Sequence, residues 1–158
     1  MTKPLLHAIC LAATLGGFNA AQAQSYGANI TLEQAKTVLN AAEAEAVSRN
    51  WPMAIAIVDT AGQLVAYLKR DDTQNGSVEV SQAKARSAAL FRRPTKAFQD
   101  TVAEGGVGLR MLTLPGAVAI EGGIPLTVGG KIVGAIGVSG MASDQDGMVA
   151  AAGAAALK

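Results

Sequence analysis

Ser139, Lys84 and Lys131 are the residues of this chain that could act as nucleophile and base in the absence of histidine. A lysine removed from water can serve as a base, so a Ser–Lys pair would activate the Ser139 hydroxyl. In the alternative interpretation, Ser139 ends a strand and Lys131 faces solvent. The structural interpretation is favoured, because serine and aspartate so often serve as caps.

Acidic residues gather towards the C-terminus, at Glu121, Asp144 and Asp146. Carboxylates bind hard cations, but calcium loops need more oxygen ligands at defined spacing than this segment offers. The sequence therefore predicts a weak surface metal site at most. Alternatively, Asp144 caps the last helix, a role in which aspartate is common.

Three arginines, Arg86, Arg92 and Arg93, cluster near one end of an expected helix. Cations near a helix C-terminus complement the helix dipole, and a guanidinium group also binds carboxylates in a fork. Helix-end complementation is the favoured interpretation for each one, and anion recognition stays open.

Two glycine-rich segments resemble phosphate loops only superficially. In residues 134–140 the glycines miss the dinucleotide-binding spacing, and Gly129-Gly130-Lys131 is followed by Ile132 rather than by serine or threonine. Glycines within a strand instead permit close approach of a helix, a neighbouring chain or a flat ligand.

The single histidine and the single cysteine, His7 and Cys10, both lie in the first 23 residues. This segment has a basic start, an apolar stretch and a small-residue ending, which predicts a secretory signal peptide cleaved after Ala23. We therefore expect a periplasmic or secreted protein. Its mature chain has no disulfide, no thiolate zinc site, no Ser-His-Asp triad and no histidine-ligated metal or haem.

The expected mature chain is electrically neutral. Residues 1–23 contain one charged residue, Lys3, so their removal takes the Lys and Arg count from 13 to 12 against 12 Asp and Glu. A neutral chain lacks the basic excess of nucleic-acid-binding proteins, and no later apolar run is long enough for a membrane span. The remaining 135 residues suit one domain.

Apolar periodicity and turn residues predict an α+β domain. A short flexible lead-in over residues 24–30 precedes a helix over 32–48, whose start carries a Thr31/Gln34 capping box. Further helices are expected over 77–91, 96–103 and 145–157, with a glycine-rich loop at 104–108. Apolar runs predict five strands, at residues 53–59, 64–70, 118–120, 124–128 and 131–138. Because hairpins link neighbouring strands, we expect a five-stranded antiparallel sheet flanked by helices, with residues 31–158 forming a single domain.

Several motifs together resemble one known family. They are Thr31 to Ala35, Trp51 to Asp59, Lys84 to Thr95, Leu114-Pro115-Gly116, Glu121 to Leu126, Gly134 to Gly140, and Gln145-Asp146 before an Ala-Gly helix. In this order they resemble the GlcG/HbpS-like haem-binding protein family over about residues 30–158. The resemblance implies a compact α+β domain with a five-stranded antiparallel sheet, assembly into homo-oligomers and, in some exported members, haem binding.

The resemblance also implies a ligand site. The residues that match the family motifs, expected around one cleft, are Lys84, Arg86, Phe91, Pro94, Gly122, Gly123, Pro125, Ser139, Gly140 and Asp146. Where related domains use a histidine on the haem iron, this mature chain has none. The candidate iron ligands are then Met53, Met111, Met141, Met148, Tyr26, Tyr67, a lysine, or no side chain at all.

Three functions remain open from the sequence. The leading one is a non-enzymatic haem- or tetrapyrrole-binding protein, exported, in haem handling or redox sensing. The alternative is an enzyme or accessory protein in oxidised-carbon (glycolate-like) catabolism, with Lys84 or Asp146 as acid or base. The third is a structural oligomer that packs through Ala- and Gly-rich faces.

Overall fold

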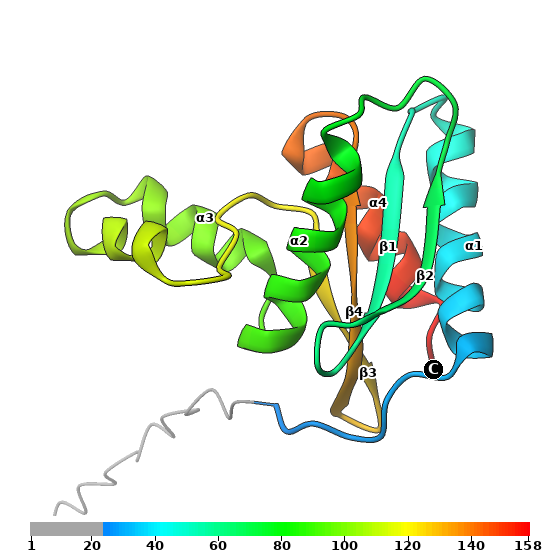
Figure 1. The fold of residues 1–158 in the computed structure, drawn as a ribbon, viewed down its shortest axis with the longest axis horizontal. Helices are drawn as coiled ribbons and strands as arrows, with labels where there is room; N and C mark the ends of the chain where they lie inside the picture. Colours follow the sequence, from blue (N-terminus) through cyan, green and yellow to red (C-terminus); the bar gives the residue numbers. More distant parts are fainter. Residues whose placement is uncertain (1–23) are drawn as a thin grey trace, which may run out of the picture.

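The computed structural model describes residues 24–158, so the predicted signal peptide, with His7 and Cys10, lies outside the described residues. Figure 1 shows one domain of helices packed on a sheet. The elements are α1 (Leu32–Ser48), β1 (Ala54–Asp59), β2 (Leu64–Lys69), α2 (Ser77–Phe91), α3 (Thr95–Ala103), the 3-10 helix η1 (Gly106–Thr113), β3 (Gly123–Val128), β4 (Lys131–Ser139) and α4 (Ser143–Ala155).

The predicted α+β class and antiparallel sheet are confirmed. The strand order is β2-β1-β4-β3, and every neighbouring pair is antiparallel. β1 is central and almost wholly buried, as its unbroken apolar run predicts. Gly129 and Gly130 have positive φ angles of 56° and 75°, which the tight turn between β3 and β4 requires.

The sheet has four strands, so the prediction of a fifth at residues 118–120 is wrong. The β-branched residues there fit a strand, but their backbone makes other bonds. The Val118 N–H donates to Ser87 Oγ on α2, and the Glu121 N–H donates to Gln99 Oε1 on α3. Two helix side chains therefore accept the hydrogen bonds of backbone N–H groups that would otherwise donate to a neighbouring strand.

Helices cover both faces of the sheet. α2 packs on one face across β4, β1 and β3, while α1 and α4 pack together on the other face. Gly137 on β4 lets α2 approach closely, because a Cβ at this position would overlap the Ser81 carbonyl oxygen and lie 2.8 Å from the Ala85 Cβ. This glycine therefore permits the close approach of a helix, which is one of the three partners that the sequence allows.

The segment expected as a lead-in is attached to the sheet. Backbone bonds join Ser25 and Gly27 to Ile132, and Ile30 to Val133, beyond the point where β1 stops pairing with β4. The Tyr26 hydroxyl donates to the carbonyl oxygens of Ala89 and Leu90 at the end of α2. These bonds fix the start of the described chain against the body of the domain.

α3 and η1 form an arm that extends away from the sheet (Figure 1). We define the arm as residues 95–121. η1 packs against α3, and none of its residues is buried. The sequence predicted only a glycine-rich loop at 104–108, whereas residues 106–113 form a 3-10 helix. Within residues 24–158, no helix is long and apolar enough to cross a membrane.

Candidate functional site

A buried ion pair joins helices from opposite faces of the sheet. The Lys84 ammonium on α2 donates to Asp146 Oδ2 on α4 at 2.7 Å and to the Val138 carbonyl oxygen at 3.2 Å. The two side chains are 1% and 3% exposed. β3 begins beside Gly137, and just before it the Gly122 carbonyl oxygen accepts a bond from the Val138 N–H at 2.9 Å, whereas the Val138 carbonyl oxygen accepts from Lys84.

Glycine makes room for this ion pair. Gly122 has φ of 127°, and a Cβ there would lie 2.7 Å from the Val138 carbonyl oxygen and 2.8 Å from Lys84 Nζ. At Gly123, a Cβ would overlap the Lys84 carbonyl oxygen and lie 2.7 Å from Thr95 Cγ2. Four of the expected site residues, Lys84, Gly122, Gly123 and Asp146, therefore lie together.

The carboxylate of Asp146 is strongly desolvated. Its Oδ1 accepts a bond from the Met141 N–H at 3.1 Å, and it lies in the first turn of α4, where the helix dipole favours negative charge. Burial nevertheless raises the pKa of Asp146 above its usual 3.8, and the bonds from Lys84, Met141 and Gly140 oppose part of the rise. The low-dielectric surroundings penalise this charge even though it is paired.

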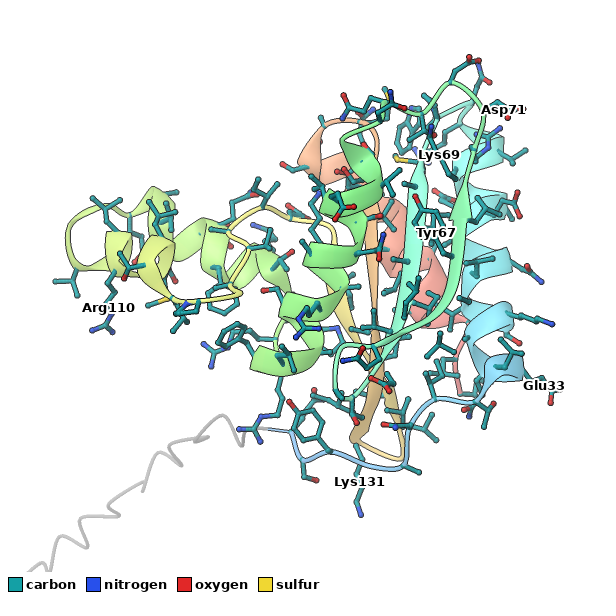
Figure 2. The ribbon with its side chains drawn as sticks, viewed as in Figure 1. Glu33, Tyr67, Lys69, Asp71, Arg110 and Lys131 are labelled. Carbon is teal, nitrogen blue, oxygen red and sulfur yellow. The ribbon has the colours of Figure 1, made fainter. Side chains whose placement is uncertain are left out.

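Ser139 has a structural partner. Its hydroxyl donates to Ser77 Oγ at 3.1 Å, and the residue is 5% exposed. Lys131 lies at the opposite end of β4, eight residues or roughly 26 Å of extended chain away. Figure 2 likewise shows Lys131 at the far end of the sheet from Lys69 and Asp71. A pair between Ser139 and Lys131 is therefore excluded.

Arg86 does not join the ion pair. It lies two positions after Lys84 on α2, and residues so spaced on a helix do not face each other. Its Nη1 donates to the Gly62 carbonyl oxygen at 3.5 Å, and the side chain is exposed. No carboxylate among residues 24–158 forms a salt bridge with it.

An open groove of about 360 Å³ lies beside Arg86. We call it the α2–hairpin groove, and its walls are Val58, Gly62, Gln63, Leu64, Glu79, Gln82, Ala83 and Arg86. It forms because β2 is the edge strand that α2 leaves uncovered. A second groove, of about 610 Å³, lies between α1 and the end of β2 and includes three carboxylates, from Glu43, Asp71 and Asp72.

Of the remaining expected site residues, Gly140 borders the ion pair, since its backbone bonds to the Asp146 carboxylate, and the others lie elsewhere. Phe91 packs edge-on against Phe98 with ring centroids 5.4 Å apart, and Pro94 immediately precedes α3. Gly140 lies against Pro52 and Met53, and Pro125 is on β3. The structure thus separates a closed ion pair from an exposed arginine, and does not gather the ten expected residues into one open cleft.

The candidate iron ligands differ in access. Met53 is fully buried in the core, Met111 is half-buried on η1, and Met141 and Met148 are 40% and 47% exposed. The Tyr67 hydroxyl is buried without a hydrogen-bond partner among residues 24–158. Burial raises the pKa of Tyr67, which disfavours the phenolate that would bind ferric iron. Residues 24–158 contain no group of three or more acidic, His or Cys side chains placed to hold a metal ion.

Polar residues that anchor the arm were missed at the sequence level. The Thr95 hydroxyl is buried and accepts a bond from the Gly123 N–H at 2.9 Å, while Ser87 and Gln99 hold the returning segment. The helical spacing of Ser77, Ser81 and Lys84 places these residues on the buried face of α2. These polar residues lie at helical spacing on the face of α2 that contacts the sheet, and this pattern could have predicted a buried polar cluster from the sequence.

Comparison with known proteins identifies the family. Residues 30–155 match the family described as "Haem degrading protein HbpS-like". The chain belongs to this HbpS-like family. It is 40% identical over 110 residues to Protein GlcG of Escherichia coli K12, covering 70% of this chain and 81% of GlcG.

Two solved structures extend the likeness to the fold. The HbpS crystal structure superposes with a TM-score of 0.76 at 30% identity, covering 85% of this chain and 94% of that one. The structure described as a "PduOC:Heme Complex" gives a TM-score of 0.74 at 26% identity, covering 82% of this chain and 96% of that one. A protein of similar fold has therefore been solved in complex with haem.

Proposed function

We propose that this HbpS-like protein is an exported, non-enzymatic haem- or tetrapyrrole-binding protein that works in haem handling. The observation that carries the proposal is the α2–hairpin groove, which combines apolar side chains with an arginine that has no carboxylate partner among residues 24–158. The haem complex of a structural relative supports the choice of ligand. The predicted signal peptide supports export.

The α2–hairpin groove has chemistry that fits a porphyrin edge. Leu64 and Ala83 offer exposed apolar contact, and the volume of the groove falls within the roughly 300–1,000 Å³ typical of small-molecule sites. The Arg86 guanidinium would bind a propionate through charge-assisted hydrogen bonds. The groove between α1 and the end of β2 is larger, but its three carboxylates outnumber its two cations, Lys69 and Arg70, whereas Glu79 and Arg86 balance each other in the α2–hairpin groove.

Haem in this groove would be held through its ring and propionates rather than through a protein ligand to iron. Met53 is sealed in the core, and the Tyr67 hydroxyl is buried with a raised pKa. Neither the methionines nor Tyr67 is among the residues that line the groove. We therefore expect weaker binding than in relatives that use histidine.

A haemin titration tests this proposal. The purified protein should give a saturable Soret shift, and Arg86→Ala should weaken haemin binding about threefold to tenfold, the loss expected for an exposed charge-assisted bond. Lys36→Ala removes an exposed cation of α1, on the opposite face of the sheet from α2, and should leave affinity unchanged. No saturable shift, or equal effects of the two substitutions, would reject the site.

Filling the α2–hairpin groove with a large side chain provides a second test of the same proposal. Ala83 lines the groove and is exposed, so Ala83→Trp should block haemin binding without disturbing the core. Ala44 is exposed on α1, on the opposite face of the sheet, and Ala44→Trp is the matched control. Undiminished binding by Ala83→Trp would place the ligand elsewhere. Finding the mature N-terminus at Gln24 in the extracellular or periplasmic fraction would test export.

A further inference from the structure

The two edges of the sheet differ in how their backbone groups are used, and the β3 edge is closed. In an antiparallel ladder, alternate residues of an edge strand direct their N–H and C=O groups away from the sheet. The Val138 N–H donates to the Gly122 carbonyl oxygen, which sets this alternation on β3. Gly123 and Pro125 then face outward. The Gly123 N–H donates to Thr95 Oγ1, and proline has no N–H, so neither residue can donate to a further strand.

The β2 edge is open. The Arg70 N–H donates to the Met53 carbonyl oxygen, so the backbone groups of Arg70 and, by alternation, of Leu68 point at β1. The N–H and C=O groups of Tyr67 and Lys69 therefore point away from the sheet. No backbone bond to another part of residues 24–158 uses them. Figure 2 shows Tyr67 and Lys69 along this strand, which is the outermost of the sheet.

The groove that flanks this edge on its α1 side carries carboxylates without partners. We call it the α1–β2 groove; it has a volume of about 610 Å³ and includes Glu43 of α1 and Asp71 and Asp72, which follow β2. No salt bridge among residues 24–158 involves any of the three. Asp71 and Asp72 are exposed, so a ligand at the β2 edge can reach their charges.

The two cations beside the groove are held by other partners. The Arg70 guanidinium donates to the Trp51 carbonyl oxygen at 2.6 Å, just after the C-terminal end of α1, where a positive charge complements the helix dipole. Lys69 Nζ lies 3.5 Å from Asn75 Oδ1, in the loop that leads to α2. The free charges of the α1–β2 groove are therefore negative, and they favour a basic ligand.

An extended polypeptide segment fits both the open edge and the groove. A peptide backbone offers donors and acceptors at the spacing of a strand edge, and its side chains alternate between the two faces of the sheet. Leu68 packs with the core on the α1 side, whereas Tyr67 packs against residues of α2. Every second side chain of an added strand would therefore lie on the side of the α1–β2 groove, where arginine or lysine could reach the carboxylates.

The β2 strand of a second copy does not have this chemistry. On its α1 side β2 presents Ala66 and Leu68, which carry no charge. An anionic membrane or a nucleic acid would be repelled by the free carboxylates and has no peptide groups to pair with the edge. The features together favour a segment of a different protein, with basic residues at alternate positions.

We propose that the β2 edge and the α1–β2 groove bind an extended basic segment of another protein by strand addition. The segment pairs with the outward backbone groups of Tyr67 and Lys69, and its alternate basic side chains bind Glu43, Asp71 and Asp72. The α1–β2 groove shares no lining residue with the α2–hairpin groove. Strand addition is therefore independent of haem binding.

Fluorescence anisotropy with a labelled eight-residue peptide of alternating arginine and valine tests the charge requirement. The purified protein should bind it saturably, with a dissociation constant below about 1 mM. A peptide of alternating glutamate and valine should bind at least about tenfold more weakly. Glu43→Gln/Asp71→Asn should weaken binding of the arginine peptide about threefold to tenfold, the loss expected for two exposed ion pairs.

The matched control for this variant is Glu33→Gln/Glu104→Gln. It removes two exposed carboxylates, one at the other end of α1 (Figure 2) and one on the arm, and changes the net charge by the same amount. The control should leave the affinity for the arginine peptide unchanged.

A proline on the β2 edge tests the strand pairing itself. The Lys69 N–H points away from β1, so Lys69→Pro breaks no bond of the β1–β2 ladder but removes a donor that an added strand needs. Lys69→Thr loses the same charge and keeps the N–H. The arginine peptide should bind Lys69→Thr at least as tightly as the wild type, and Lys69→Pro about tenfold more weakly than Lys69→Thr. Circular dichroism should be the same for both variants.

Two methylated peptides replace this comparison if Lys69→Pro does not fold. Only one of the two alternate sets of amides in an added strand faces β2. N-methylation of all arginines in one peptide and of all valines in the other should therefore abolish the binding of one peptide and spare the other. Equal binding of the two would overturn the proposal.

Other results would also overturn it. They are no saturable binding of the arginine peptide, equal affinities of Lys69→Pro and Lys69→Thr, or equal effects of the two carboxylate pairs. A wild-type dimer that Lys69→Pro converts to monomer would show instead that a second copy occupies the edge. Haemin affinity measured on the same samples reports separately on the α2–hairpin groove.

Discussion

Two cations of α2, two residues apart, meet opposite surroundings. Lys84 is 1% exposed and bonded to a carboxylate and a carbonyl oxygen, whereas Arg86 is exposed and bonded only to a distant carbonyl oxygen. The Lys84 region has glycines where any side chain would collide, and the Arg86 region has open space. The difference indicates that Lys84 holds the fold together and that Arg86 is free to bind a ligand.

The largest expected effect comes from breaking the buried pair. Lys84→Met keeps the length of the side chain but leaves the Asp146 carboxylate buried without a counter-charge. We expect the free energy of unfolding at pH 7 to fall by about 3–5 kcal/mol, as for other buried pairs that lose one partner. Urea denaturation followed by circular dichroism would measure it, and a loss below 1 kcal/mol would contradict the structural role of Lys84.

The loss in Lys84→Met should depend on pH. With the ammonium removed, the pKa of Asp146, already raised by burial, rises further. A carboxyl whose folded pKa is raised contributes stability that is fully present below its unfolded pKa, near 3.8, and is lost as pH rises through the folded value. Lys84→Met should therefore be least impaired near pH 4 and most impaired at pH 7.

The double variant Lys84→Met/Asp146→Asn removes the titrating group and serves as the reference for this pH dependence. At pH 7 it should be more stable than Lys84→Met alone, and the two should converge near pH 4. Equal stabilities of the two variants across the whole range would show that Asp146 is not the group that makes the loss of Lys84 costly.

The glycines around the pair should tolerate substitution less well than glycines in open surroundings. Gly122→Ala places a Cβ against Val138 and Lys84 at a positive φ, and should lower the free energy of unfolding by about 1–3 kcal/mol. Gly76 has a φ of −61° and nothing within 4 Å of an added Cβ. Gly76→Ala is therefore the control and should be neutral or slightly stabilising.

Local patterns predicted most of the fold. The Thr31/Gln34 capping box is present at the start of α1, and the predicted bounds of α1 and α2 match the structure. The capping box and the bounds of these helices are determined by side chains only a few residues apart in the sequence. The failure at residues 118–120 was non-local, because the bonding of Val118 and Glu121 is decided by Ser87 and Gln99, more than twenty residues earlier.

The candidate site was less accessible to sequence reasoning, for a similar reason. Lys84 and Asp146 are 62 residues apart and lie on helices that cover opposite faces of the sheet, so no local pattern predicts their contact. The separation of Lys84 from Arg86 could have been predicted. A helix turns by about 200° over two residues, so both side chains could not enter one cleft.

The smallest expected effect on stability completes the comparison. Arg86→Met retains the aliphatic part of the side chain that packs against Gly62 and removes only the guanidinium. Because that group is exposed, the free energy of unfolding should change by no more than about 0.5 kcal/mol. The same Lys-to-Met and Arg-to-Met change, two residues apart, should thus produce a large loss at position 84 and almost none at 86. A loss above 2 kcal/mol in Arg86→Met would remove the distinction between the two cations, because Arg86 would then also be a structural residue.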